Sequence, residues 1–237
     1  MRSVLAVGAH PDDIELGCGA TLLAHAAAGD HVTLLVVTGG ENGPGDDVQV
    51  TGRRAEQQAA ARTLGATLRW GGLRDCAVPS DSSTVTVIES VLREVDAELV
   101  YVHAPDDSHQ DHRAVAAATL SAARRLPRVL HYQSPSTLTF TPTVFVDVTA
   151  HLSGKLAALR CHASQVDLSA MVEPDAVVAS ARHWGAQARV GYAEAFAPTR
   201  VVLDLVPSPR RPLVALPTVE QLEPSAVPLR DVLTPHA

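Results

Sequence analysis

The chain has 237 residues, of which 46% are hydrophobic and 19% charged, with a net charge of −7 and three cysteines. This composition is typical of one large globular domain, or two small ones, with a full apolar core. The negative balance argues against nucleic acid as the main partner, because phosphate binding needs clustered positive charge. Three widely spaced cysteines exclude a disulfide framework, and no apolar run is long enough to span a membrane. We therefore expect a cytoplasmic protein without a membrane partner.

Short apolar runs alternate with helix-like segments along the chain, which is the pattern of a doubly wound α/β sheet. Strands are predicted at residues 4–9, 31–38, 67–70, 99–103, 129–132, 144–148 and 201–206. Helices are predicted at residues 20–28, 52–64, 81–92, 113–125, 152–162 and 173–189. We expect a single Rossmann-like α/β domain over residues 1–206, with a mostly parallel sheet flanked by helices. Prolines recur from residue 207 onward and predict an irregular C-terminal extension over residues 207–237.

A first polar cluster, His10-Pro11-Asp12-Asp13, directly follows the first predicted strand. Open α/β sheets bind their ligands at the carboxyl ends of strands, so these side chains lie where a site is expected. An imidazole and two carboxylates in one tight turn are costly to bury unless a cation or hydrogen-bond donors receive them. The cluster predicts a metal site with a spare carboxylate for proton transfer, and an exposed polar loop is the alternative.

A second polar cluster covers residues 103–112 and follows the strand at residues 99–103. His109 and His112 are three residues apart, so they share a face of a helical first turn. Catalytic zinc takes three protein ligands and leaves one position open for water, and His10, Asp13 and His112 supply such a set. We predict one zinc ion per chain, with other divalent metals as alternatives.

The remaining polar side chains of the two clusters suggest how protons move. Asp12 is predicted to be the general base, which takes a proton from metal-activated water and passes it to a leaving amine. Asp111 is predicted to hold His109 protonated, so that His109 faces a developing oxyanion. These roles together describe metal-assisted hydrolysis of an amide.

A non-catalytic nucleotide- or sugar-binding module is the rival hypothesis. The GCG sequence at residues 17–19 opens a helix after the first strand, and Glu41 follows the second strand as a ribose-binding acid would. However, Leu22 stands at the third glycine position of that fingerprint, and Asp12 and Asp13 would place negative charge beside a pyrophosphate. The hydrolase is therefore favoured.

Five sequence motifs follow one another along the chain. They are AHPDDIELGCGATL at residues 9–22, TGGENG at 38–43, DSHQDH at 107–112, KLAALRCHASQ at 155–165 and YAEAF at 192–196. Together they resemble the LmbE-like (PIG-L) deacetylase family over about residues 3–205. The resemblance implies a zinc-dependent enzyme that removes N-acetyl groups from glucosamine-containing molecules. It also implies zinc ligation by His10, Asp13 and His112, with Asp12 as base, His109 as oxyanion or acid group and Asp111 as its partner.

The resemblance extends to the substrate. It implies that Arg53 points at the sugar, and Glu41 is assigned to substrate binding with it. We expect a small soluble N-acetylglucosamine conjugate or natural-product intermediate, and a larger amide such as a thiol conjugate is the alternative. The roles of the HxSQ motif (His162, Gln165) and of YAEAF (Tyr192, Glu194) stay open. Apolar helices at the sheet edges would allow a homo-oligomer.

Overall fold

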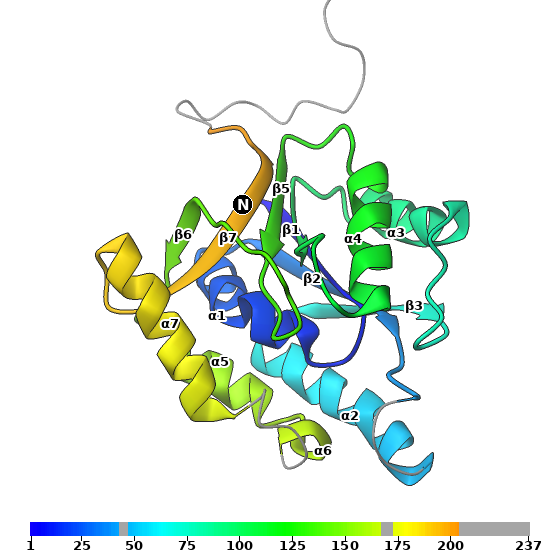
Figure 1. The fold of residues 1–237 in the computed structure, drawn as a ribbon, viewed down its shortest axis with the longest axis horizontal. Helices are drawn as coiled ribbons and strands as arrows, with labels where there is room; N and C mark the ends of the chain where they lie inside the picture. The colour runs from blue at the N-terminus through cyan, green and yellow to red at the C-terminus, as the bar shows by residue number, and fades with distance from the viewer. Residues whose placement is uncertain (43–46, 167–172, 204–237) are drawn as a thin grey trace, which may run out of the picture. The chain divides into compact units, whose positions relative to one another are not determined.

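A seven-stranded sheet lies between two layers of helices in the computed structural model, which describes residues 1–42, 47–166 and 173–203 (Figure 1). The strands are β1 (Ser3–Gly8), β2 (His31–Thr38), β3 (Thr67–Leu73), β4 (Leu99–His103), β5 (Arg128–Tyr132), β6 (Val144–Asp147) and β7 (Ala193–Val201). The helices of the described part are α1 (Asp13–Ala27), α2 (Asp47–Thr63), α3 (Ser82–Glu94), α4 (Gln110–Ala122), α5 (Leu152–Leu159), α6 (Ala163–Val166) and α7 (Pro174–Ala188). One compact unit covers Met1–Val202. The predicted extension over residues 207–237 lies outside the described residues.

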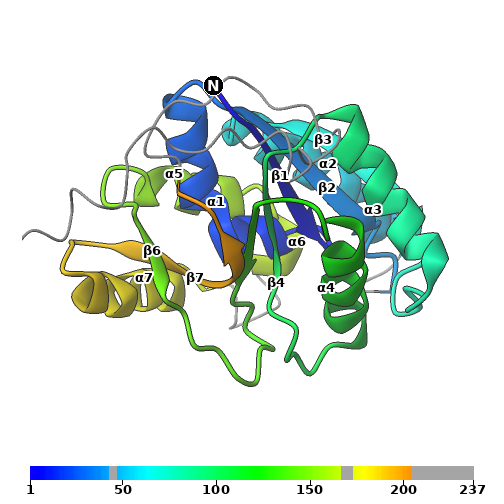
Figure 2. The same cartoon turned by 90° about the horizontal axis from the view of Figure 1, so that it is seen from above.

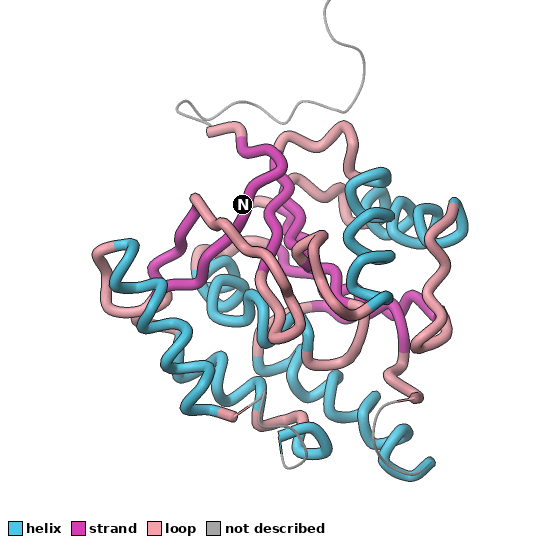
Figure 3. Tube along the Cα trace, in the orientation of Figure 1, coloured by secondary structure: helices cyan, strands magenta, loops and turns pink. Residues whose placement is uncertain are grey.

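The strand order is β3-β2-β1-β4-β5-β7-β6. Strands β1 to β5 pair in parallel, and β7 pairs antiparallel with both β5 and β6. The chain runs outward from β1 to β3 and then returns to place β4 on the other side of β1. The carboxyl ends of β1 and β4 therefore form a switch point, where open α/β sheets bind their ligands. The predicted fold class is confirmed, with strands in the centre and helices around them (Figure 3).

Both faces of the central strands are buried, which explains why their sequences are continuous apolar runs. Alternate residues point to opposite faces. Leu5 and Val7 of β1 pack in one core cluster with residues of α3 and α4, whereas Val4 and Ala6 pack in another with residues of α1, α2 and α5. Figure 2 shows α3 and α4 together on their side of the sheet. The strand ends are thus fixed by a core on each side.

Several element boundaries differ from the prediction. α1 begins at Asp13 rather than at residue 20, because tertiary contacts override the low helix propensity of Gly17 and Gly19. α4 begins at Gln110 and so includes His112. The strand predicted at residues 201–206 is wrong: β7 covers Ala193–Val201, and residues 204–206 lie outside the described part. Pairing with β5 and β6 fixes this strand despite its small alanine side chains.

Gly17 is required by the close approach of Tyr132. A Cβ atom at Gly17 would lie 2.2 Å from the Tyr132 ring, and the Tyr132 hydroxyl donates to the Val7 carbonyl at 2.8 Å. We expect Gly17→Ala to lower the free energy of unfolding by about 1–3 kcal/mol, because the ring must shift in a packed core. Urea unfolding measures this change.

Gly52→Ala in α2 is the matched control. A Cβ atom at Gly52 would have no atom within 4 Å. Alanine should therefore stabilise the protein by about 0.4–1 kcal/mol through a more restricted unfolded chain and its better helix propensity. Equal effects of the two substitutions on unfolding would contradict the steric explanation.

Candidate active site

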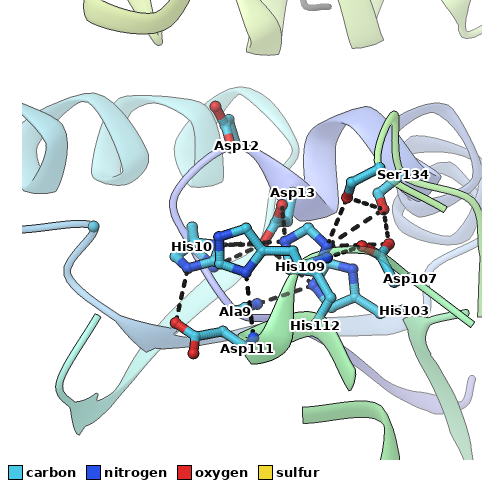
Figure 4. Close-up of polar contacts among 12 residues, drawn as sticks. Ala9, His10, Asp12, Asp13, His103, Asp107, His109, Asp111, His112 and Ser134 are labelled. Carbon is cyan, nitrogen blue, oxygen red and sulfur yellow. Dashed lines mark hydrogen bonds and ion pairs between the residues drawn. The ribbon is translucent and has the colours of Figure 1, made fainter. Parts of the chain in front are cut away.

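The two polar clusters meet at the carboxyl ends of β1 and β4 (Figure 4). His10 follows β1, Asp13 begins α1, and His112 lies in the first turn of α4. Their exposed fractions are 8%, 6% and 5%. The structure thus brings together the three side chains that the sequence analysis predicted as metal ligands.

The two imidazoles lie close to each other, and each faces a different oxygen of the Asp13 carboxylate. The distances are 3.3 Å from His112 Nε2 to His10 Nδ1, 3.4 Å from His10 Nδ1 to Asp13 Oδ2 and 3.4 Å from His112 Nε2 to Asp13 Oδ1. A tetrahedral zinc ion with bonds of about 2.0–2.1 Å places its ligand atoms roughly 3.3–3.4 Å apart. The donor set and its spacing therefore fit zinc.

The second ring nitrogen of His10 lies between two carboxylates. His10 Nε2 is 3.0 Å from Asp75 Oδ1 and 3.2 Å from Asp111 Oδ2. Asp111 is fixed in turn, because it accepts hydrogen bonds from the backbone N–H groups of Cys76 at 2.7 Å and Val78 at 3.2 Å. Burial disfavours ionisation of Asp75, but the hydrogen bonds from His10 and from the Asn42 backbone and the charge of His10 together outweigh it and hold the pKa of Asp75 below its usual range. These carboxylates orient the ring so that Nδ1 faces the metal position.

His112 is held in the same way from its other side. His112 Nδ1 lies 3.2 Å from Asp107 Oδ2, 3.4 Å from the Ser134 hydroxyl and 3.2 Å from the Ser136 hydroxyl. Ser134 also donates to Asp107 at 2.5 Å. Each of the two predicted histidine ligands therefore has an acidic partner behind it, the arrangement expected of metal-binding imidazoles.

The predicted pairing of Asp111 with His109 is wrong. The Asp111 carboxylate contacts His10, whereas His109 caps α4 and its Nδ1 accepts the backbone N–H of Asp111 at 3.2 Å. The reason is the N-cap conformation, in which the His109 side chain bonds the backbone N–H of Asp111 rather than its carboxylate. Burial and then the charges of His10 and His112 lower the pKa of His109, contrary to the expected protonation. The charge of Asp111 acts in the expected direction but does not outweigh them. His109 still lies at the site, with its ring 4.6 Å from that of His112.

Asp12 directly precedes Asp13 at the N-cap of α1, and its side chain makes no cap hydrogen bond and stands apart from the cluster in Figure 4. Its φ of 95° is in the left-handed region, and its backbone N–H donates to Gln57 Oε1 at 3.2 Å. Burial and then the charge of Asp13 raise the pKa of Asp12 to about 7. A carboxylate with a raised pKa is suited to exchange protons near neutral pH.

The two residues assigned to substrate both make contacts within the protein. The Arg53 guanidinium is buried and donates to the carbonyls of Gly40 at 2.8 Å and Pro11 at 3.3 Å. The Glu41 carboxylate accepts backbone N–H groups of Gly39 at 3.0 Å and Asp75 at 2.8 Å. Arg53 thus ties the Asp12 loop to the loop after β2, and Glu41 supports the loop that carries Asp75. Their contact with substrate stays a prediction.

We expect Arg53→Ala to lower both stability and kcat, rather than to raise KM alone. It removes hydrogen bonds that hold the Asp12 loop, and each bond from a charged donor is worth about 1.5–3 kcal/mol. Arg69→Ala is the control, because the Arg69–Glu94 pair is largely exposed and should contribute no more than about 1 kcal/mol. Urea unfolding and steady-state kinetics measure both variants. An Arg53→Ala enzyme with normal stability and a raised KM would instead favour a role as sugar anchor only.

The sequence analysis assigned no role to several buried residues at the site. His103 is fully buried, its ring stacks on His112 at 3.9 Å, and burial lowers its pKa to about 4. The sequence could have indicated His103, because it ends β4 at the same edge of the sheet at which the first cluster follows β1. Asp107 carried a signal as well, since it opens the DSHQDH motif. Asp75 and Gln57 carry none, because each enters the site from a loop or helix that only the tertiary fold brings near.

A model of the family described as PIG-L, GlcNAc-PI de-N-acetylase, matches residues 5–123. The uncharacterized deacetylase YaiS of Escherichia coli K12 is 36% identical over 172 residues, which are 69% of this chain and 91% of that protein. The chain belongs to the PIG-L family. The crystal structure of the conserved protein TT1542 from Thermus thermophilus matches with a TM-score of 0.77 and 28% identity, over 89% of this chain and all of that one.

Most of the named relatives of this PIG-L protein are deacetylases. Some are named for 1D-myo-inositol 2-acetamido-2-deoxy-alpha-D-glucopyranoside and one for diacetylchitobiose. The family resemblance and the enzyme class, an N-deacetylase, are confirmed. One relative differs: the 4-oxalmesaconate hydratase of Pseudomonas putida is 25% identical over 194 residues, 70% of this chain and 75% of that protein. Among the described residues, no helix is long and apolar enough to cross a membrane.

Proposed function

We propose that the protein is a zinc-dependent hydrolase that removes an N-acetyl group from an N-acetylglucosamine-type sugar in a small conjugate. The observation that carries the proposal is the convergence of His10 Nδ1, His112 Nε2 and the Asp13 carboxylate at 3.3–3.4 Å from one another. Membership of the PIG-L family supports the choice of an amide as the bond that is cleaved.

A zinc ion bound there would lower the pKa of water toward about 7 and polarise the amide carbonyl. Asp12 takes a proton from the attacking water and returns it to the nitrogen of the leaving amine. The amide C–N bond then breaks, and acetate and a free amine are formed. His109, at the edge of the site, donates a hydrogen bond to the oxygen that becomes negatively charged. His103 and the carboxylates Asp75, Asp107 and Asp111 keep the ligand side chains in place.

An acetate-release assay on a panel of compounds tests the proposal. The panel contains N-acetylglucosamine linked to small alcohols, the same compounds with N-butanoyl groups, a bulky thiol-conjugate amide and an unsaturated dicarboxylic acid. The zinc-loaded enzyme should release acetate and free amine from the N-acetyl sugars. Hydration of the unsaturated acid without cleavage of any amide would show instead the activity for which the Pseudomonas putida relative is named.

A larger amide is the second candidate, because a cavity lies next to the site. Its lining includes Leu16, one turn after Asp13, Ser134, which contacts His112, and Trp184 of α7. A cavity in this place offers room for a group longer than acetyl or for the remainder of a conjugate. Cleavage of the thiol-conjugate amide alone would refute the deacetylase assignment and leave the zinc hydrolase intact. The cytoplasmic address and self-association stay predictions.

A further inference from the structure

Helix α1 is broken close to the site. Cys18 has backbone angles of φ −148° and ψ 16°, which are not helical. The break separates a first turn, residues 13–17, from the longer part of the helix. It occurs where the Tyr132 ring lies against Gly17. Backbone groups on both sides of the break consequently need hydrogen-bond partners outside the helix.

Lys155 and Glu194 supply these partners. Lys155 Nζ donates to the Leu16 carbonyl at 2.7 Å, before the break. Glu194 accepts the backbone N–H groups of Ala20 at 3.2 Å and Thr21 at 2.7 Å, after it. The two side chains also pair with each other at 2.6 Å. One ion pair from α5 and β7 thus bridges the broken helix.

The pair is unusual in this chain. Lys155 is the one lysine of the sequence, and both partners are 4% exposed. A buried ion pair seldom adds stability over apolar side chains of the same volume, because desolvation of two charges is costly. Stability alone therefore does not account for it. Its directional contacts with three backbone groups suit it to set the geometry of the break.

The geometry of the break affects the predicted metal centre through the first turn of α1. A helix of five residues is too short to be stable by itself. The turn carries Asp13, and Gln57 holds its beginning, since Gln57 accepts the Asp12 N–H at 3.2 Å and donates to Glu15 at 2.7 Å. Lys155 holds its end at the Leu16 carbonyl. A shift of the end would tilt the turn and move Asp13.

We propose that Lys155 and Glu194 are positioning residues that fix the first turn of α1 and so hold Asp12 and Asp13 in place for metal binding and proton transfer. The proposal gives a role to Glu194 of YAEAF, which the sequence analysis left open. The expected change in kcat rests on the proposed function, whereas the expected change in hydrogen exchange of the first turn of α1 does not.

The double variant Lys155→Met/Glu194→Gln tests the proposal in the full chain, because it leaves no unpaired buried charge. In the zinc-free protein, amide hydrogen exchange of residues 13–18 should become at least about tenfold faster, since opening of this turn is a local event. Exchange in β4 should be unchanged. Affinity for zinc, measured by chelator competition, should fall by about tenfold or more, the scale found when groups behind metal ligands are removed. kcat should fall. KM is not diagnostic, because Lys155 and Glu194 also line the cavity that offers room for part of the substrate.

Ser3→Ala is the control, because it removes one hydrogen bond, to the Val95 carbonyl, at the amino end of β1 and so at the end of the sheet opposite the site. It should lower the free energy of unfolding without changing zinc affinity or kcat. A double variant that behaves like this control, with unchanged exchange at residues 13–18 or unchanged zinc affinity, would overturn the proposal. A wild-type protein that binds no zinc would refute the proposed function, and the exchange measurement would still decide whether the pair holds the turn.

Discussion

Asp12→Asn should keep zinc and fold but lose kcat by roughly 100-fold or more, the usual contribution of a general base. Asparagine has the same shape, tolerates the left-handed backbone at this position and keeps the N–H that Gln57 accepts. It cannot take a proton from water. The measurement is steady-state kinetics on an N-acetylglucosamine conjugate, with zinc content determined on the same samples.

The exposed Asp147 provides the control for this substitution. Its carboxylate caps a turn at Thr149, far along the chain from either polar cluster, so Asp147→Asn should leave kcat unchanged. Normal turnover in Asp12→Asn with full zinc content would show that another group is the base. Loss of zinc from Asp12→Asn would instead place Asp12 among the ligands.

Removal of a predicted ligand should have the largest effect on metal binding. We expect His10→Ala, Asp13→Ala and His112→Ala to lower zinc affinity by more than about 100-fold, because each removes one of three protein ligands. Asp107→Asn and Asp111→Asn should lower it by about 10–100-fold, since they only loosen the imidazoles. Chelator competition with purified protein measures all five.

His183→Ala controls for the general effect of losing a histidine. His183 is exposed on α7 and contacts Gln187, so its removal should leave zinc affinity as in the wild type. Equal zinc affinity in His112→Ala and His183→Ala would exclude the proposed ligand set. Zinc affinity that is lowest in the three ligand variants and intermediate in Asp107→Asn and Asp111→Asn would support both the ligands and the carboxylates behind them.

The sequence was sufficient to predict most of the sheet and the meeting of His10, Asp13 and His112 at its edge, because both leave local patterns. Fully buried parallel strands read as apolar runs, and β1, β2 and β4 were predicted nearly to the residue. His10, Asp13 and His112 lie in loops and a helix start directly after such strands. The parallel order then brings them to one edge.

What the sequence did not reveal depends on contacts between distant segments. Asp111 was paired with His109 because they are neighbours in the chain, but the fold turns its carboxylate to His10, 101 residues away. Arg53 and Glu41 were assigned to the substrate, yet backbone groups of other loops already bind them. The last strand was predicted at residues 201–206, whereas β7 covers Ala193–Val201. Its alanines lack the β-branched pattern that marked the other strands.

Titration of the metal-free protein with zinc, while acetate release from an N-acetylglucosamine conjugate is followed, tests the central claim most directly. Activity should be absent without metal, rise in proportion to added zinc and reach its maximum at one zinc ion per chain. The His112→Ala variant should stay inactive throughout the same titration. Full activity in the metal-free protein, or a zinc-dependent rise that is unchanged in His112→Ala, would contradict a zinc hydrolase built on His10, Asp13 and His112.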